Sequence, residues 1–319
     1  MNSLPSKQEL LAFQDRWVRP AGMVAILGSL IFAAGVVVQQ VGVESADTDV
    51  EQLDNFHDHA TQLIAGQVLQ GLGFALFAVT IYVLFRAASG RAERMRRSLL
   101  PLALIGPPLF LIAMILVSFG VRDIADQFVE ERPAIEQQAR QEAAAARAPS
   151  DETPDERVEN ALEDRAEDLG RDSSIIQIGS GLRVTATLAI AFALIYTPLW
   201  AMRTGLLTRF WASLGMALGA ALLLLGVFGL MGLVLWFAAI GLQLAGWWPR
   251  PRPPAWEAGV AIPWLRPGEE PGGPGAPPPS GTVEGSGREI TEPPLPEDQI
   301  EEPGRETQGE RRKKRKRRQ

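Results

Sequence analysis

Apolar residues in this chain are concentrated in long, nearly uncharged blocks separated by strongly polar segments. The first four blocks cover residues 21–43, 62–85, 99–121 and 175–202. Each block reaches the roughly 20 residues that a helix needs to cross the ~30 Å hydrocarbon core of a bilayer. The pattern therefore predicts four membrane-spanning helices in this part of the chain.

A fifth block, Phe210–Pro249, is forty residues long and carries no charge. As a single helix it would measure about 60 Å, twice the thickness of the hydrocarbon core. We expect it to fold back as two spans, roughly 210–226 and 228–248. The turn is expected at residues 226–229, where two glycines relax the backbone. The predicted fold class is thus an all-α integral membrane protein, a bundle of six transmembrane helices.

Several predicted spans carry small residues along one helical face. Small side chains let two helices approach closely in a membrane, so these faces are expected to form helix–helix contacts. The heptad-spaced stripes are Ala21, Gly28, Gly35 and Gly42 in the first span and Gly66, Gly73 and Thr80 in the second, and Gly215 and Gly219 form a shorter pair in the fifth.

The N-terminal 20 residues and the segment after the first span are polar. Ser6 and Glu9 have the spacing of a capping box, and Leu10, Phe13 and Trp17 share a helical face. We expect residues 1–20 to form a cytoplasmic interfacial helix, unless this helix simply extends the first span. Residues 44–58 are read as an acidic loop.

The longest hydrophilic insert, residues 122–172, contains sixteen acidic residues and seven arginines. Residues 134–148 and 154–169 are predicted to be helical, the second with Glu/Arg pairs at helical spacing. Because Val158 and Leu162 provide only a thin apolar stripe, we expect two solvated helices without a packed core. The insert is predicted to be extracytoplasmic.

The tail, residues 249–319, is rich in proline and glycine and is predicted to be a disordered cytoplasmic segment. Anionic lipid headgroups are the expected ligand of the basic run at its end, since each basic residue near a membrane contributes about 1 kcal/mol. Nucleic acid or a protein partner is the alternative. The run consists of Arg311, Arg312, Lys313, Lys314, Arg315, Lys316, Arg317 and Arg318.

Charge also predicts orientation. With six spans, the N-terminus, the arginine-rich connector 86–97, Arg203, Arg209 and the basic tail all fall on one side. Short connectors with an arginine excess face the cytoplasm, so both termini are predicted to be cytoplasmic in the cell membrane. The great excess of arginine over lysine is typical of a GC-rich bacterial genome.

Polar residues inside predicted spans are functional candidates because each is costly in hydrocarbon unless it is paired or hydrated. One hypothesis is that Arg183 faces the bundle interior and pairs with Asp58 or with glutamines, lining a small outward-facing pocket. The alternative is that Arg183 extends to the outer headgroups. The other pocket candidates are Gln67, Gln70, Gln177, Ser180 and Thr187.

The sequence contains few other candidates for metal-binding or catalytic residues. Asp54, His57 and Asp58 share a helical face and could meet one metal ion, but no fourth ligand is evident nearby. A solvated helix cap is the competing interpretation, and no metal or cofactor is predicted. The chain has no cysteine, no phosphate-binding glycine loop and no nucleophile elbow. The sequence therefore does not predict an enzyme.

Two stretches, Met202-Arg203-Thr204-Gly205-Leu206-Leu207 and Pro253-Pro254-Ala255-Trp256-Glu257-Ala258-Gly259, resemble a family of uncharacterised multi-pass bacterial membrane proteins. The resemblance covers the fourth span through Trp264 and implies a membrane location, but it brings no catalytic residues. The predicted function is a non-enzymatic scaffold or envelope component. The alternative is a small-solute transporter or channel that uses the polar faces of the second and fourth spans. A water-filled cavity would favour transport, and a closed bundle would favour a scaffold.

Overall fold

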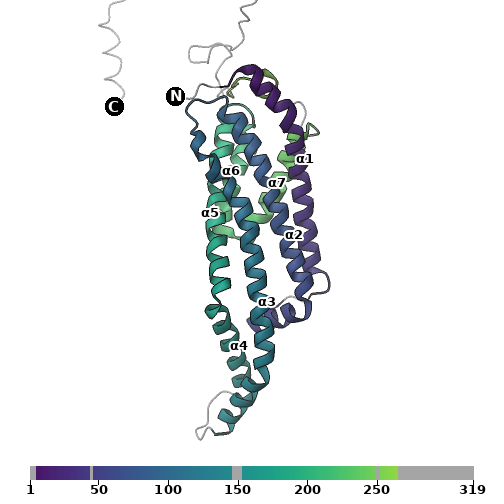
Figure 1. The fold of residues 1–319 in the computed structure, drawn as a ribbon, viewed down its shortest axis with the longest axis vertical. Coiled ribbons are helices and arrows are strands. Elements are labelled where there is room, and N and C mark those ends of the chain that lie inside the picture. The colour runs from purple at the N-terminus through teal and green to yellow at the C-terminus, as the bar shows by residue number, and fades with distance from the viewer. Residues whose placement is uncertain (1–4, 44–45, 146–152, 249–251, 265–319) are drawn as a thin grey trace, which may run out of the picture. The chain divides into compact units, whose positions relative to one another are not determined.

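The computed structural model describes residues 5–43, 46–145, 153–248 and 252–264, apart from the side chains of residues 227 and 228. These residues form helices and no strand (Figure 1), as predicted for an all-α protein. The elements are α1 (Lys7–Gln40), α2 (Asp49–Ser89), a 3-10 turn η1 (Arg97–Leu99), α3 (Leu100–Ala145), α4 (Pro154–Asp172), α5 (Ser174–Arg203), α6 (Arg209–Leu225), α7 (Val227–Ala245) and α8 (Ala255–Ala258).

Four helices, α1, α2, α3 and α5, are long and apolar enough to cross a membrane. The forty-residue uncharged block folds back, with the turn at Gly226, where φ is +52°. Its two helices, α6 and α7, are shorter, with 17 and 19 residues. At 1.5 Å per residue they measure about 25 and 28 Å. The fold-back is confirmed, whereas two complete crossings by this hairpin remain a prediction.

The predicted stripes of small residues on α1 and α2 pack against each other. A Cβ added at Gly73 would lie 2.4 Å from the carbonyl oxygen of Gly28, and one added at Gly35 would lie 2.6 Å from that of Gly66. One heptad further, the Thr80 hydroxyl donates to the carbonyl oxygen of Ala21 at 3.2 Å. The backbones are therefore in direct contact at seven-residue intervals, as expected for small-residue packing.

Aromatic side chains fill the middle of the bundle. Phe77 of α2 and Phe237 of α7 are fully buried and stack with their ring centroids 4.0 Å apart. Trp236 lies over Gly215 of α6 and donates from its indole nitrogen to the carbonyl oxygen of Trp211 at 2.9 Å. Gly219 contacts α5 beside Leu194. The predicted small pair in α6 thus accommodates α7 on one side and α5 on the other.

The N-terminal segment is not a separate interfacial helix. Residues 7–20 belong to α1, which continues through Pro20 into the first span. Pro20 is exposed, so the carbonyl group that it leaves without an intrahelical donor can find another partner. The predicted capping box is present, because the Ser6 hydroxyl accepts from the Glu9 amide and the Glu9 carboxylate accepts from the Ser6 amide.

The acidic loop predicted at residues 44–58 is helical from Asp49 onward. α2 begins there, capped by the Thr48 side chain, and bends at His59, which has φ −120° and ψ 23°. The insert also differs from its prediction, because α3 continues without interruption from the third span through Pro133 to Ala145. Pro133 is exposed to solvent, where the loss of one backbone hydrogen bond costs little.

The second predicted helix of the insert corresponds to α4, which begins with a second capping box at Thr153 and Glu156. Hydrogen bonds from the Thr153 amide and hydroxyl lower the pKa of the Glu156 carboxyl. α4 lies alongside the distal part of α3, beyond the apolar part of the bundle (Figure 1). We call α3 residues 122–145 together with α4 the acidic projection.

The acidic projection has its own small core, so the prediction of two solvated helices without a core is wrong. The missing apolar partners come from the first turns of α2, far away in sequence. The core consists of Leu53, Phe56 and Leu63 of α2, Ile124, Ala125 and Phe128 of α3, and Leu162, Ala166 and Leu169 of α4.

The proline-rich tail is also ordered in part. Residues 252–264 pack on the bundle, contrary to the prediction of disorder from residue 249 onward. The rest of the tail, including the basic run Arg311–Arg318, lies outside the described residues.

Candidate functional site

The polar residues predicted to line a pocket between α2 and α5 are not brought together. The Gln70 amide donates to the side-chain oxygen of Gln39 on α1 at 2.6 Å. The Ser118 hydroxyl of α3 donates to the side-chain oxygen of Gln67. Both α2 glutamines are therefore paired across interfaces with other helices, α1 and α3.

The pocket candidates on α5 either form hydrogen bonds with nearby residues of the chain or are at least partly exposed at the surface. The Gln177 amide donates to the carbonyl oxygen of Arg171, and the Thr187 hydroxyl donates to that of Arg183 at 2.8 Å. Ser180 is half-buried. The Arg183 side chain is exposed and makes no hydrogen bond or ion pair within the described part of the chain, so it pairs neither with Asp58 nor with a glutamine there. The alternative, in which Arg183 extends to the outer headgroups, stays a prediction.

Two of the three residues considered for a metal site, Asp54 and His57, bind α3 instead. Both carboxylate oxygens of Asp54 accept from Arg132 at 2.9 Å, and His57 Nδ1 lies 2.9 Å from a carboxylate oxygen of Asp126. Asp58 is exposed. Among the described residues, no three His, Asp or Glu side chains are arranged to hold a metal ion. Asp54 and His57 serve to tie the start of α2 to the acidic projection.

At the opposite end of the bundle, where α1 begins and α2 ends, residues 252–264 dock on the α5–α6 connector. We call this end the basic end. The Trp256 indole donates to the carbonyl oxygen of Leu206, and the Trp264 indole donates to that of Leu207, both at 2.8 Å. The Ile262 amide donates to the Thr204 carbonyl oxygen at 3.2 Å. The two stretches that carry the family resemblance are thus in direct contact.

This contact depends on one glycine. Gly205 has φ +76°, a conformation that side chains disfavour, and a Cβ added there would lie 2.0 Å from the Ile262 carbonyl oxygen. Only glycine satisfies both the turn and the close approach of the 252–264 segment.

A half-buried arginine fixes the same segment to α2. Arg91 donates to the carbonyl oxygens of Ala255 at 2.8 Å, Ala87 at 2.9 Å and Val260 at 3.3 Å. With its amide oriented to suit its neighbours, buried Gln14 accepts from Arg91 and donates to the Trp256 carbonyl oxygen at 2.8 Å. Burial lowers the pKa of the Arg91 guanidinium to about 10, so it stays charged at neutral pH.

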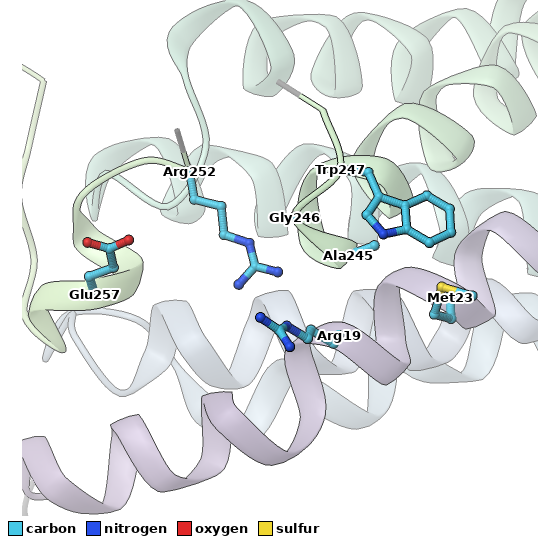
Figure 2. A pocket seen from close by; sticks show the side chains of 7 residues that line it. All are labelled: Arg19, Met23, Ala245, Gly246, Trp247, Arg252 and Glu257. Atoms are coloured by element: carbon cyan, nitrogen blue, oxygen red, sulfur yellow. The ribbon is translucent and has the colours of Figure 1, made fainter. Parts of the chain in front are cut away.

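An open cavity of about 780 Å³ lies beside this segment. The guanidinium groups of Arg19 and Arg252 point toward each other across it, with Met23 and Trp247 on one side and Glu257 on the other (Figure 2). We call this cavity the arginine pocket; it is lined by Arg19, Met23, Ala245, Gly246, Trp247, Arg252 and Glu257. A neighbouring cavity of about 520 Å³ shares Arg19, Arg252 and Glu257 with it.

Arg252 is held in place by the end of α7. Its Nε donates to the Gln243 carbonyl oxygen at 3.3 Å, and an Nη donates to that of Leu244 at 2.5 Å. Arg19 comes from α1, which approaches α7 where a Cβ added at Gly22 would lie 2.6 Å from the Gly241 carbonyl oxygen. The pocket therefore depends on packing between residues more than 200 positions apart.

The sequence pattern does not predict the arginine pocket. Arg19 and Arg252 each lie just beyond the end of an apolar block and next to a proline. That position marks them as residues near a membrane boundary, but it gives no sign that they meet. The chain matches no protein-family model, no curated protein and no solved structure. The resemblance to uncharacterised multi-pass membrane proteins accordingly stays a prediction.

Proposed function

We propose that this protein is a non-enzymatic membrane scaffold that displays the acidic projection on one side of the cell membrane. The observation that carries the proposal is the continuity of α3, which is both a helix of the bundle and half of the projection. A single uninterrupted helix couples the position of the projection to the anchor. Such coupling is suited to holding a protein partner rather than to moving a solute.

The interior of the bundle supports a scaffold over a transporter. Gln67 and Gln70, which the sequence predicts to line a pocket, are bound in helix interfaces. Phe74, Phe77 and Phe237 are fully buried in the same bundle. Transport requires a polar, hydrated route near the middle of the membrane, and these contacts fill that region with packed side chains.

The membrane arrangement is part of the proposal. In it, the α6–α7 hairpin completes six crossings, and the basic end, with both termini, faces the cytoplasm. Support comes from the exposed arginines Arg19, Arg94, Arg203 and Arg209 near that end, which follow the positive-inside rule. The acidic projection is then extracytoplasmic. Lipid binding by the basic tail belongs to this proposal and rests on sequence alone.

The test uses the absence of cysteine, because one introduced thiol is then the only one in the chain. Gln70→Cys lies inside the bundle and Gln138→Cys on the exposed face of the projection. In intact cells, a membrane-impermeant maleimide should label Gln138→Cys and leave Gln70→Cys unlabelled. After denaturation, both should react, which verifies that both proteins are present.

Labelling of Gln70→Cys in the native membrane would reveal a hydrated route and favour the transporter alternative. A Gln138→Cys protein that reacts only after the membrane is opened would instead reverse the assigned orientation.

A further inference from the structure

We propose that the arginine pocket binds the phosphate of a phospholipid whose headgroup also carries a hydrogen-bond donor, such as an ethanolamine ammonium or a glycerol hydroxyl. The first argument is the convergence of Arg19 and Arg252 on one open cavity (Figure 2). Guanidinium groups bind phosphate oxygens through paired, charge-assisted hydrogen bonds. Two of them facing the same space provide such donors from two directions.

The site is partly preorganised. The carbonyl groups of Gln243 and Leu244 at the end of α7 hold the Arg252 guanidinium beside the cavity. Gly246, with φ +82°, ends α7 so that the chain can turn toward Arg252. Less side-chain freedom is lost on binding when one of the two cations is already fixed. Arg19 is exposed, and its side chain makes no hydrogen bond or ion pair with a described residue.

The surroundings favour a lipid over free phosphate. Trp247 and Trp248 are each 55% exposed at the end of α7, and exposed tryptophans at the end of an apolar helix are typical of the headgroup region. From the pocket toward the middle of the bundle, α1 exposes Met23, Leu27 and Leu30 at helical spacing. An acyl chain can lie along this strip while its phosphate occupies the pocket.

Glu257 restricts which lipid headgroups can bind in the pocket. Glu257 lines the same cavity on the side away from Trp247 (Figure 2). A carboxylate repels a second anionic group and accepts hydrogen bonds from ammonium or hydroxyl groups. Phosphatidylethanolamine and phosphatidylglycerol have such donors beside one phosphate, whereas phosphatidylcholine has none. This inference does not depend on the scaffold proposal, because a transporter could hold a lipid at the same place.

The experiment measures lipid binding to the detergent-purified full-length protein by native mass spectrometry. Phosphatidylethanolamine, phosphatidylglycerol and phosphatidylcholine are titrated separately. We expect the first two to occupy one site per chain at lower concentrations than phosphatidylcholine. Arg19→Gln should weaken their binding by roughly tenfold, the loss of one charge-assisted contact. Arg19 is the preferred target because Arg252 also supports the end of α7.

Arg16→Gln is the matched control, since it removes the same charge from an exposed position on α1 outside the pocket. It should bind lipid like the wild type. Glu257→Gln should reduce the preference over phosphatidylcholine while the phosphate contacts remain. All these proteins share the same basic tail, so its contribution cancels.

The proposal fails if Arg19→Gln binds these lipids as the wild type does, or if Arg16→Gln weakens binding equally. Inorganic phosphate is added as a competitor to distinguish the two sources of phosphate. Displacement of the lipid by inorganic phosphate at submillimolar concentrations would also overturn the assignment to a lipid headgroup.

Discussion

The bundle and the acidic projection are both helical, but the bundle adds direct backbone contacts at glycines to its packing of large side chains. In the bundle, glycines bring backbones into contact, as at Gly28 with Gly73. In the projection, large side chains such as Phe128 and Leu162 fill the space between helices, and ion pairs close its edges. The Arg165 guanidinium, for example, lies 2.7 Å from the Glu131 carboxylate.

The difference follows from the solvent that each region is suited to. Lipid tails are as apolar as leucine, so helices in a membrane gain little from burying large apolar side chains and gain more from close van der Waals packing. In water, burying a Phe or Leu side chain contributes about 1.5–3 kcal/mol. A small core is therefore sufficient for the projection, and the two regions should respond differently to substitution.

The largest expected effect comes from Gly73→Leu. A Cβ at this position would lie 2.4 Å from the Gly28 carbonyl oxygen and 2.6 Å from the Phe32 amide nitrogen, which are backbone atoms that a rotamer change cannot move. We expect α1 and α2 to separate and the folded yield after detergent extraction to fall severalfold. Gly181→Leu is the matched control, because nothing lies within 4 Å of an added Cβ there. Equal yields from both variants would contradict the glycine-contact account.

Phe128→Ala should act on the projection alone. Phe128 is fully buried in its core, and removing such a ring costs about 3–5 kcal/mol. Hydrogen exchange measured by mass spectrometry should show faster exchange in α4 and in the distal part of α3, while α1 and α7 keep their protection. Loss of protection throughout the chain would mean that the projection and the bundle unfold together.

Gln243 offers a substitution that should stabilise the bundle. Its side chain is 1% exposed, and neither its amide nitrogen nor its oxygen has a partner among the described residues. Burying an unsatisfied amide costs about 1–3 kcal/mol, so Gln243→Leu should raise the midpoint of thermal unfolding in detergent. Gln70→Leu makes the same chemical change but removes the bond to Gln39, and it should lower the midpoint.

The smallest effect concerns pH and the projection. Hydrogen bonds from Gln127 and Arg165 lower the pKa of the Glu131 carboxyl below its usual value. The ionised carboxylate therefore stabilises the fold above the usual carboxyl pKa, and this contribution is lost as the pH falls through the lowered value. Because about a third of each side chain of the Glu131–Arg165 pair is exposed, we expect less than about 1 kcal/mol.

The measurement compares thermal unfolding of the wild type and Glu131→Gln at pH 7 and pH 3 by circular dichroism. The difference between the two proteins should be present at pH 7 and should shrink at pH 3. A difference that is the same at both pH values would exclude a role for the Glu131 charge.

Periodicity along the sequence predicted the parts of the fold whose contacts repeat regularly. The heptad stripes on the first two spans identified the faces that meet, because seven residues return to nearly the same side of a helix. The forty-residue apolar block predicted a hairpin because one helix of that length cannot fit within a bilayer. Both inferences needed only local pattern and the geometry of the helix.

Contacts between distant segments could not be predicted in this way. The insert looked too polar for a core because Leu53 and Phe56, which complete that core, lie in a segment read as a loop. Likewise, Arg19 and Arg252 line one cavity where α1 approaches α7 closely at Gly22. Pro20 and Pro133 lie inside α1 and α3, since an exposed proline interrupts hydrogen bonding without ending the helix.

Because α3 is a single uninterrupted helix, its length fixes how far the projection extends from the bundle. Its last 24 residues, Arg122–Ala145, extend about 36 Å at 1.5 Å per residue. A protein held at the tip of the projection would be kept at a fixed height above the lipid surface and at a fixed azimuth around the helix axis. Inserting four residues into both α3 and α4 would raise that protein by about 6 Å and rotate it by about 40°. Under the scaffold proposal, the lengths of α3 and α4 would therefore set the spacing between the membrane and the partner.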